Sequence, residues 1–328
     1  MTLPTLIVTL DAGTGGRSVI ESTIGSAARV VYLSDIADGE RAKALAESTV
    51  LLARDTSKEL HAGEAALIGQ ARLIQYVTAG IDHIPLGDLP TGIPVASNGG
   101  AYAEPMAEHA LAMTLAALKR LLVEHGKLAG GTFDQFKTNR MLEGSVCGIL
   151  GFGGIGVATA RVMRALGARV HAINRRGVTD EPVDWIGTDT ALDRLLAVSD
   201  ILVLSLPLTP ATNGLLGSRE LALMKKDAVL VNLARGEIVD EAALFAHLKD
   251  TPEFTACIDA WWIEPVRHGQ FRMDYDFMSL PNVIASPHNS ASVARWRNVA
   301  LRRAVENVRN LLQNGQAQHL VPPEDRMK

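Results

Sequence analysis

The chain has 328 residues, of which 47% are hydrophobic and 21% are charged, and its formal net charge is −4. That length is sufficient for two domains, and the charge gives no electrostatic reason to expect a nucleic acid or an anionic membrane as partner. No apolar run is long enough to span a bilayer and no basic leader opens the chain, so we expect a cytoplasmic protein. Because Cys147 and Cys257 lie in apolar segments without a Cys or His cluster, no metal is predicted.

Short apolar strands alternate with helical patterns from the start of the chain, which predicts α/β architecture with parallel sheets. In the first part, strands are expected at residues 5–10, 28–33, 50–53, 73–77 and 94–96, with helices at 40–46 and 59–68. The segment Gly13-Thr-Gly-Gly16 follows a strand but lacks the spacing of a dinucleotide-binding turn, so we expect a loop there.

A long apolar helical pattern follows at residues 103–122. It is too apolar for a solvated helix, so we expect it to be buried between domains or subunits, with purely internal burial as the alternative. His109 lies on its apolar face and is interpreted as a core or interface histidine. Tyr102, just before this helix, lies near the expected interdomain cleft and is a candidate substrate contact.

The most informative segment is Val146-Cys-Gly-Ile-Leu-Gly-Phe-Gly-Gly-Ile-Gly-Val157, an apolar strand that turns on three glycines into a helix. Gly151, Gly153 and Gly156 have the G-x-G-x-x-G spacing of dinucleotide-binding turns. The first glycine makes the tight turn, the second lets a pyrophosphate approach the backbone, and the third lets the helix pack on the strand. A helix at 157–166 and a strand at 168–173 complete the βαβ context. The alternative is a merely structural turn.

The residues that close the second strand of this unit indicate which dinucleotide is preferred. An NAD-binding unit usually places an acidic residue about 20 positions beyond the glycines, where it accepts from the ribose 2′-OH. Here the position is occupied by Asn174, followed by Arg175 and Arg176. Two guanidiniums can clamp a 2′-phosphate that a carboxylate would repel, so NADP(H) is predicted over NAD(H). The alternative is a solvated turn that happens to be basic.

The alternation resumes after this unit, with strands expected at 201–205, 229–233, 255–259 and 283–285. The last helix, at 292–312, is rich in arginine on faces expected to be solvated and ion-paired, and it is expected to return to the first domain. We therefore predict two Rossmann-like or flavodoxin-like domains with parallel sheets. The dinucleotide-binding domain, residues 99–290, would be inserted into a discontinuous substrate domain made of residues 1–98 and 291–328.

Three polar residues lie at or just beyond strand ends in the second half: Arg235, Glu264 and His288. Hydride transfer to a 2-oxo acid requires that a carboxylate be held, a ketone be polarised and a proton be supplied. The planar fork of arginine suits the first two tasks, and histidine suits the third because its pKa lies near neutrality. A carboxylate beside the histidine would favour the imidazolium and fix the ring.

The chain resembles the D-isomer-specific 2-hydroxyacid dehydrogenase family over nearly its whole length. Besides the glycine turn, the resemblance rests on Thr78-Ala-Gly-Ile-Asp-His83, Asn98-Gly-Gly-Ala-Tyr-Ala-Glu-Pro-Met-Ala-Glu-His109, Ser205-Leu-Pro-Leu-Thr209, Asn232-Leu-Ala-Arg-Gly-Glu-Ile-Val-Asp240 and Ser286-Pro-His288. It implies that Arg235 binds and polarises the substrate, that His288 is the acid/base and that Glu264 is its partner. The backbone amides of Ala79 and Gly80 would receive the substrate carboxylate.

The resemblance also implies a set of cofactor contacts and an assembly. Asp259 would hold the nicotinamide carboxamide, and the remaining contacts would come from Phe152, Gly153, Gly154, Ile155, Leu206, Pro207 and Ala234. The helix at 103–122 and its flanks would form a homodimer interface. Trp261-Trp262 departs from the family, whose loops are usually less bulky there; we interpret Trp262 as structural packing and leave Trp261 open.

The leading hypothesis is an NADP(H)-dependent 2-oxoacid reductase with D stereospecificity, acting on a small acid such as glyoxylate or hydroxypyruvate. A dinucleotide-responsive corepressor is the rival from another class, although the chain has no long disordered tail. A dehydrogenase of a small anion such as phosphite is a further alternative. Formate enzymes carry glutamine where this chain has Glu264, which disfavours that reaction.

Overall fold

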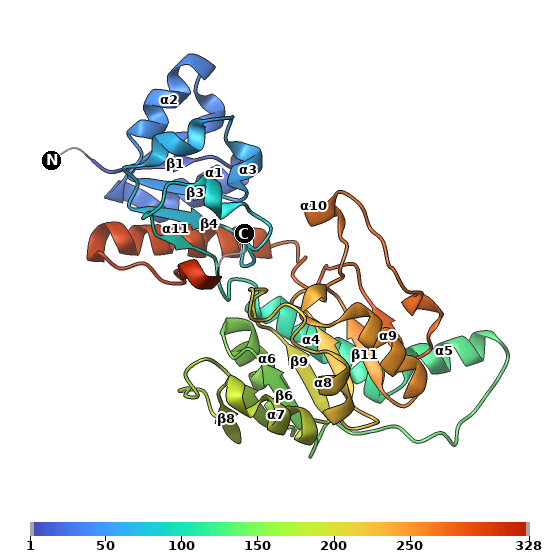
Figure 1. Cartoon of the computed structure of the whole chain (residues 1–328). Coiled ribbons are helices and arrows are strands. Elements are labelled where there is room, and N and C mark those ends of the chain that lie inside the picture. Colours follow the sequence, from blue (N-terminus) through green and yellow to red (C-terminus); the bar gives the residue numbers. More distant parts are fainter. Residues whose placement is uncertain (1–2, 326–328) are drawn as a thin grey trace. The chain divides into compact units, whose positions relative to one another are not determined.

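The computed structural model describes residues 3–325, and the chain forms two compact units (Figure 1). Unit 1 combines residues 1–102 with residues 293–328, and unit 2 spans residues 103–292. Unit 1 is therefore made of two chain segments separated by unit 2. The division falls after Tyr102 and after Ser292, a few residues beyond the limits at 98 and 290 suggested by the sequence.

Unit 1 contains a parallel sheet of five strands in the order β2-β1-β3-β4-β5. The strands are Thr5–Val8 (β1), Arg29–Tyr32 (β2), Val50–Ala53 (β3), Leu73–Tyr76 (β4) and Val95–Ala96 (β5). Successive residues of a strand point to opposite faces, so Leu6 and Val8 enter one core while Ile7 enters the other.

Helices cover both faces of this sheet. The core on the face of Leu6 includes apolar residues of α1 (Gly13–Ile24) and α11 (Trp296–Asn314). The core on the opposite face includes residues of α2 (Asp38–Ala46) and of the 3-10 helix Glu64–Ile68. The α11 helix contributes Ala304, Val305 and Val308, all fully buried, so the C-terminal segment completes the core of the N-terminal one.

Unit 2 contains a parallel sheet of seven strands in the order β12-β11-β10-β9-β6-β7-β8. The strands are Val146–Leu150 (β6), Arg169–Ile173 (β7), Trp185–Gly187 (β8), Ile201–Leu204 (β9), Val229–Asn232 (β10), Thr255–Ile258 (β11) and Val283–Ala285 (β12). The strand order reverses between β6 and β9. Ligands of open parallel sheets bind at such a switch point, beyond the carboxyl ends of the strands.

The helices of unit 2 are α4 (Ala103–Leu118), α5 (Leu121–Ala129), α6 (Gly154–Ala165), α7 (Leu192–Val198), α8 (Ser218–Leu223), α9 (Glu241–Asp250) and α10 (Pro265–His268). Helix α4 packs against α6 through small buried residues that include Ala103, Ala107 and Ala158. Small side chains let the two helix backbones approach closely, which explains why α4 is so rich in alanine.

The α/β class with parallel sheets is confirmed, but several predicted elements are wrong. Residues 13–16 form the first turn of α1 rather than a loop. The helix expected at 103–122 is two helices, because Arg120 adopts a left-handed conformation with φ of 53°. The helix expected at 59–68 is likewise divided, into α3 (Thr56–Glu59) and the 3-10 helix, with Gly63 at φ 83° before the latter.

Two further differences concern short or terminal elements. Strand β8, of three residues, has no counterpart among the expected strands. The last helix begins at Trp296 and ends at Asn314 rather than spanning 292–312. No helix among residues 3–325 is long and apolar enough to cross a membrane.

Candidate active site

The carboxyl edge of the unit 2 sheet carries the polar residues singled out from the sequence. Arg235 follows β10, Asp259 follows β11 directly, and His288 follows β12. These three strands are consecutive neighbours in the sheet, and because they are parallel their carboxyl ends share one edge. The fold therefore explains why residues distant in sequence gather at one place.

His288 is held by its ring and by its backbone. Its Nδ1 atom lies 2.8 Å from Oε2 and 2.9 Å from Oε1 of Glu264, and its amide donates to the carbonyl oxygen of Asp259 at 2.9 Å. The residue adopts φ of 49°, a left-handed conformation that non-glycine residues rarely occupy and that often marks functional sites. With Nδ1 engaged by a carboxylate, Nε2 is the ring atom available to a substrate.

Glu264 is buried, with 6% of its surface exposed, at the N-cap of α10. Burial alone would raise the pKa of its carboxyl group. The hydrogen bond to His288, the charges of His288 and Arg235, and the Trp261 amide, which donates at 2.6 Å, outweigh that effect and lower the pKa. Glu264 is therefore ionised and fixed in orientation, as required of a partner that stabilises an imidazolium.

Asp259 is fully buried and organises the segment that carries His288. Its Oδ1 atom accepts from the Ser286 hydroxyl at 2.6 Å and from the Asn289 amide at 3.1 Å, and its Oδ2 atom accepts from the Ser290 amide at 3.3 Å. His109 of α4 joins this network, because its Nε2 atom lies 3.0 Å from Ser286 Oγ. The sequence placed His109 in a core or interface, whereas the structure places it, half-buried, in contact with the candidate site.

Arg235 lies in a turn that Asn232 stabilises. The Asn232 side chain accepts from the Ala234 amide at 3.0 Å and donates to the Arg235 carbonyl oxygen at 2.8 Å. The Arg235 side chain is half-buried and donates to the carbonyl oxygen of Ala234 at 2.7 Å. The role of Asn232 was not predicted from the sequence. The feature that could have indicated it is a polar residue at the last position of an otherwise apolar strand.

The glycine turn between β6 and α6 has the geometry that each glycine was expected to supply. Gly151 has φ of 96°, and a side chain there would meet the Leu206 backbone nitrogen at 2.6 Å. A Cβ atom on Gly156 would meet the Gly151 carbonyl oxygen at 2.4 Å. A Cβ atom on Gly153 would meet nothing within 4 Å, so open space lies beside this backbone at the start of α6.

That open space fits a dinucleotide pyrophosphate. The first amide groups of α6 lack partners within the helix, and the helix dipole adds positive potential there. Gly153 and Gly154 are exposed, Ile155 is half-buried and Phe152 is buried beneath the turn. The Ser205 hydroxyl donates to the Gly151 carbonyl oxygen at 2.6 Å, which holds the segment containing Leu206 and Pro207 against the turn.

The basic segment after β7 is an ordered turn rather than an open chain. Asn174 Oδ1 accepts from the amides of Arg176 and Gly177 at 3.0 Å and 2.7 Å, and Asn174 Nδ2 donates to the carbonyl oxygen of Val178 at 2.9 Å. Asn174 therefore shapes the turn. Arg175 and Arg176 are exposed on it.

The two tryptophans before Glu264 both pack into the protein. Trp261 is 4% exposed and donates from Nε1 to the Ser286 carbonyl oxygen at 2.9 Å. Trp262 stacks on Phe277 with ring centroids 5.3 Å apart and donates to the Val239 carbonyl oxygen at 2.7 Å. Both side chains thus stabilise the loop on which Glu264 depends.

Ala79 and Gly80 belong to unit 1, in the turn that follows β4, and both are half-buried. The structure thus brings Arg235, Asp259, Glu264 and His288 to one edge of unit 2, which also carries the glycine turn. A switch-point glycine turn together with a histidine–carboxylate pair and an arginine defines the class of nicotinamide-dependent oxidoreductases.

Comparison with known proteins defines the family. The family model described as "D-isomer specific 2-hydroxyacid dehydrogenase, NAD binding domain" matches residues 111–290. The chain is 33% identical over 272 residues to a glyoxylate reductase from Aeropyrum pernix, covering 78% of this chain and 77% of that one. The chain belongs to the D-isomer-specific 2-hydroxyacid dehydrogenase family and is an NAD(P)-dependent oxidoreductase of the 2-hydroxyacid/2-oxoacid class.

Solved structures agree in fold. A Pyrobaculum aerophilum protein, provisionally described as a formate dehydrogenase, matches with a TM-score of 0.81 at 29% identity, covering 98% of this chain and all of that one. A D-isomer-specific 2-hydroxyacid dehydrogenase from Xanthobacter autotrophicus Py2, solved with NADPH and MES, matches with a TM-score of 0.77 at 26% identity. That match covers 97% of this chain and 98% of the other.

Proposed function

We propose that the protein is an NADPH-preferring reductase that converts a small 2-oxo acid, such as glyoxylate or hydroxypyruvate, into the 2-hydroxy acid, with the D configuration where the product is chiral. The observation that carries this proposal is the His288–Glu264 pair, 2.8 Å apart, at the sheet edge shared with Arg235. The glyoxylate reductase activity named for the Aeropyrum pernix relative supports the substrate class. A cytoplasmic location stays a prediction from the sequence.

In this proposal each residue has a separate role in reduction of the 2-oxo group. A bound reduced nicotinamide supplies the hydride that adds to the carbonyl carbon. His288 holds a proton at Nε2 and donates it to the carbonyl oxygen, while Glu264 stabilises the imidazolium before transfer. Arg235 stabilises the negative charge that grows on that oxygen in the transition state. The assignment of the backbone amides of Ala79 and Gly80 to the substrate carboxylate stays a prediction from the family resemblance.

The cofactor would be held by the glycine turn and the residues around it. Gly151, Phe152, Gly153, Gly154, Ile155 and Gly156 would surround the pyrophosphate, and Leu206, Pro207, Ala234 and Asp259 would contact the nucleoside and nicotinamide ends. The NADPH preference is supported by the exposed guanidiniums of Arg175 and Arg176 on the turn shaped by Asn174. The NADPH-bound relative from Xanthobacter autotrophicus Py2 supports the same choice.

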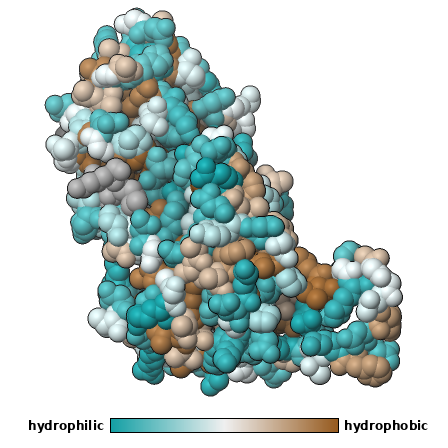
Figure 2. Space-filling model, turned by 45° about the vertical axis from the view of Figure 1, so that its right-hand side comes forward, coloured by the Kyte–Doolittle hydropathy of each residue, from teal (hydrophilic) through white to brown (hydrophobic). Residues whose placement is uncertain are grey.

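We also propose a homodimer. Helix α4 is largely buried within unit 2, but α5 and the segment after it expose large apolar side chains: Leu121, Leu122, Leu128, Phe133, Phe136 and Met141. Figure 1 shows this part of unit 2 reaching away from its sheet, and Figure 2 shows apolar patches along a projecting arm. Exposed apolar area of this kind is typical of subunit interfaces. Sedimentation of the wild type should give a dimer, which Phe136→Asp should dissociate; a monomeric wild type would refute the proposal.

The test is NADPH oxidation measured by its absorbance against a panel of 2-oxo acids, repeated with NADH. Turnover of glyoxylate, hydroxypyruvate or another 2-oxo acid with NADPH preferred would support both parts of the proposal. In Arg176→Ser, the KM for NADPH should rise while the KM for NADH changes little. Equal or better use of NADH by the wild type would refute the cofactor preference, and absence of turnover with every 2-oxo acid would refute the reaction.

A further inference from the structure

Helix α4 brings an ionisable side chain, His109, to the carboxyl edge of the unit 2 sheet. The Cys257 thiol of β11 lies 3.6 Å from the carbonyl oxygen of Met113, which fixes α4 against this strand. One helical turn earlier in α4, the His109 ring meets residues that follow β11 and β12. Its Nε2 atom lies 3.0 Å from Ser286 Oγ and 3.8 Å from Asp259 Oδ1. The proposed reaction itself does not use this ring.

The hydrogen bonds determine which ring nitrogen of His109 carries a hydrogen. The Ser286 hydroxyl has a single hydrogen, which it donates to Asp259 Oδ1 at 2.6 Å, because a carboxylate oxygen can only accept. Ser286 Oγ must therefore accept from His109, so Nε2 of that ring is protonated. The result is a chain of hydrogen bonds with one direction, from the α4 ring through the hydroxyl to the buried carboxylate.

The carboxylate of Asp259 holds the segment that carries His288. It accepts from the amides of Asn289 at 3.1 Å and Ser290 at 3.3 Å, and the Asp259 carbonyl oxygen accepts from the His288 amide at 2.9 Å. His288 has φ of 49°, and a left-handed non-glycine residue persists only where surrounding contacts hold it. The position of the His288 ring therefore depends on the orientation of Asp259.

The backbone of Ser286 is already fixed, so its remaining freedom is rotation of the side chain. Its amide donates to the Ile258 carbonyl oxygen at 3.0 Å, and its own carbonyl oxygen accepts from Trp261 Nε1 at 2.9 Å. A hydroxyl that accepts from His109 while donating to Asp259 has its oxygen held in one orientation. The His109 ring therefore completes the set of contacts that orient the Asp259 carboxylate.

We propose that His109 is a positioning residue for proton transfer. Its Nε2–H group, acting through Ser286 and Asp259, holds His288 in the geometry in which that ring delivers its proton. The inference rests on the proposed function, in which His288 is the acid. Because a small misplacement of a reacting group slows the chemical step, loss of this contact should lower kcat. The KM for NADPH should change little, since most of the proposed cofactor contacts lie at the glycine turn.

The experiment compares two substitutions of His109 in the full-length enzyme. His109→Gln keeps an N–H donor near the position of Nε2, whereas His109→Leu replaces the ring by an apolar side chain. In His109→Leu, kcat for 2-oxo acid reduction should fall about tenfold, the scale of one lost hydrogen bond. In His109→Gln, most of that loss should be restored. His247→Leu is the matched control with unchanged kcat, because His247 is a half-buried histidine of α9 whose Nε2 has no hydrogen-bond partner.

Ser286→Ala tests whether the ring acts through the hydroxyl. Both substitutions break the same chain, so adding His109→Leu to Ser286→Ala should cause no further loss of kcat. Losses that multiply would overturn the inference, because the two side chains would then act independently. Normal kcat in His109→Leu, or a loss in His109→Gln as large as in His109→Leu, would overturn it as well. NADPH titration of each variant corrects kcat for any unfolded fraction.

A measurement on the wild type tests the hydrogen-bond chain without turnover. Nitrogen NMR of the protein labelled at histidine should show a hydrogen on Nε2 of His109, and His109→Gln identifies its signals by their loss. A ring with its hydrogen on Nδ1 alone would overturn the inference and leave the proposed function intact. Absence of turnover with every 2-oxo acid, together with a hydrogen on Nε2, would overturn the proposed function instead.

Discussion

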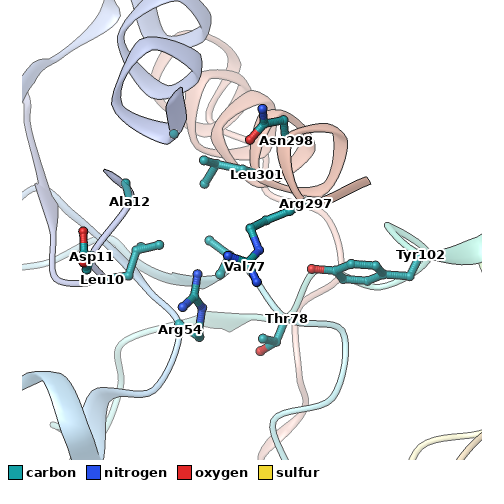
Figure 3. A pocket seen from close by; sticks show the side chains of 11 residues that line it. Leu10, Asp11, Ala12, Arg54, Val77, Thr78, Tyr102, Arg297, Asn298 and Leu301 are labelled. Atoms are coloured by element: carbon teal, nitrogen blue, oxygen red, sulfur yellow. The ribbon is translucent and has the colours of Figure 1, made fainter. Parts of the chain in front are cut away.

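The carboxyl edges of the two sheets hold their charged side chains in contrasting ways. In unit 2, His288 and Glu264 contact each other at 2.8 Å, and Asp259 is bonded to Ser286 and to two backbone amides. In unit 1, Arg54 and Arg297 line a cavity without an acidic partner among the described residues (Figure 3). Groups that move a proton must be oriented in advance, which explains the fixed contacts in unit 2, whereas Arg54 and Arg297 are exposed to solvent.

The largest effect is expected from His288→Asn, which removes the proton donor but keeps a residue type tolerant of φ near 49°. We expect kcat for 2-oxo acid reduction to fall about 10³-fold, the usual scale for losing a general acid. NADPH binding, measured by fluorescence titration, should change little because the glycine turn is untouched. Near-normal turnover in this variant would remove His288 from the mechanism.

The second test keeps His288 and removes the carboxylate that orients its ring. Glu264→Gln keeps the size of the side chain but removes the charge that favours the imidazolium, so we expect kcat to fall roughly 10²-fold. The KM for NADPH should change little, because the glycine turn is untouched, so the loss should appear in kcat. Glu237→Gln is the control, because that carboxylate pairs with Arg267 instead. If kcat in Glu264→Gln stayed near that of the wild type, Glu264 would have no role in proton transfer.

Two substitutions in the glycine turn distinguish an effect on protein stability from an effect on cofactor binding. Gly156→Ala places a Cβ atom 2.4 Å from a carbonyl oxygen, so it should destabilise the protein by about 1–3 kcal/mol. Gly153→Ala meets no atom within 4 Å and has φ of −95°, so the unfolding temperature should be unchanged. The KM for NADPH should nevertheless rise about tenfold, because the new methyl occupies the approach to the backbone. Unaltered cofactor affinity in Gly153→Ala would contradict the proposed pyrophosphate position.

The smallest effect concerns a charged pair of unit 1 that serves stability rather than binding. The guanidinium of Arg41, bonded to Glu64 at 2.7 Å, lowers the pKa of that carboxyl from 4.5 to about 2. A depressed pKa means that the pair stabilises the fold above pH 4.5 and loses this contribution as the pH falls toward 2. The contribution at neutral pH is at most about 3 kcal/mol.

Thermal unfolding across this pH range checks the prediction. Glu64→Gln should lower the unfolding temperature at pH 7 and flatten its decline below pH 4.5. Glu47→Gln removes an exposed carboxylate 3.7 Å from Arg29 and should leave the decline unchanged. A decline that persists in Glu64→Gln would assign the acid sensitivity to other carboxylates.

Much of the site was accessible from the sequence because its residues are tied to local patterns. Gly151, Gly153 and Gly156 follow an apolar strand at fixed spacing, and each requirement for glycine is a backbone property of that one turn. Arg235 and His288 follow strands that apolar runs reveal. Parallel strands of one sheet share an edge, so the pattern alone predicted that these residues gather.

The tertiary structure alone decided features that depend on contacts between distant segments. Nothing in the sequence around His109 indicates that its ring reaches Ser286, 177 residues away, since helical spacing marks only an apolar face. Likewise, an arginine-rich helix gives no sign that Arg297 lines a cavity together with Arg54. Local periodicity determines which face a side chain occupies, but which segment packs against that face is set by the packing of the whole unit.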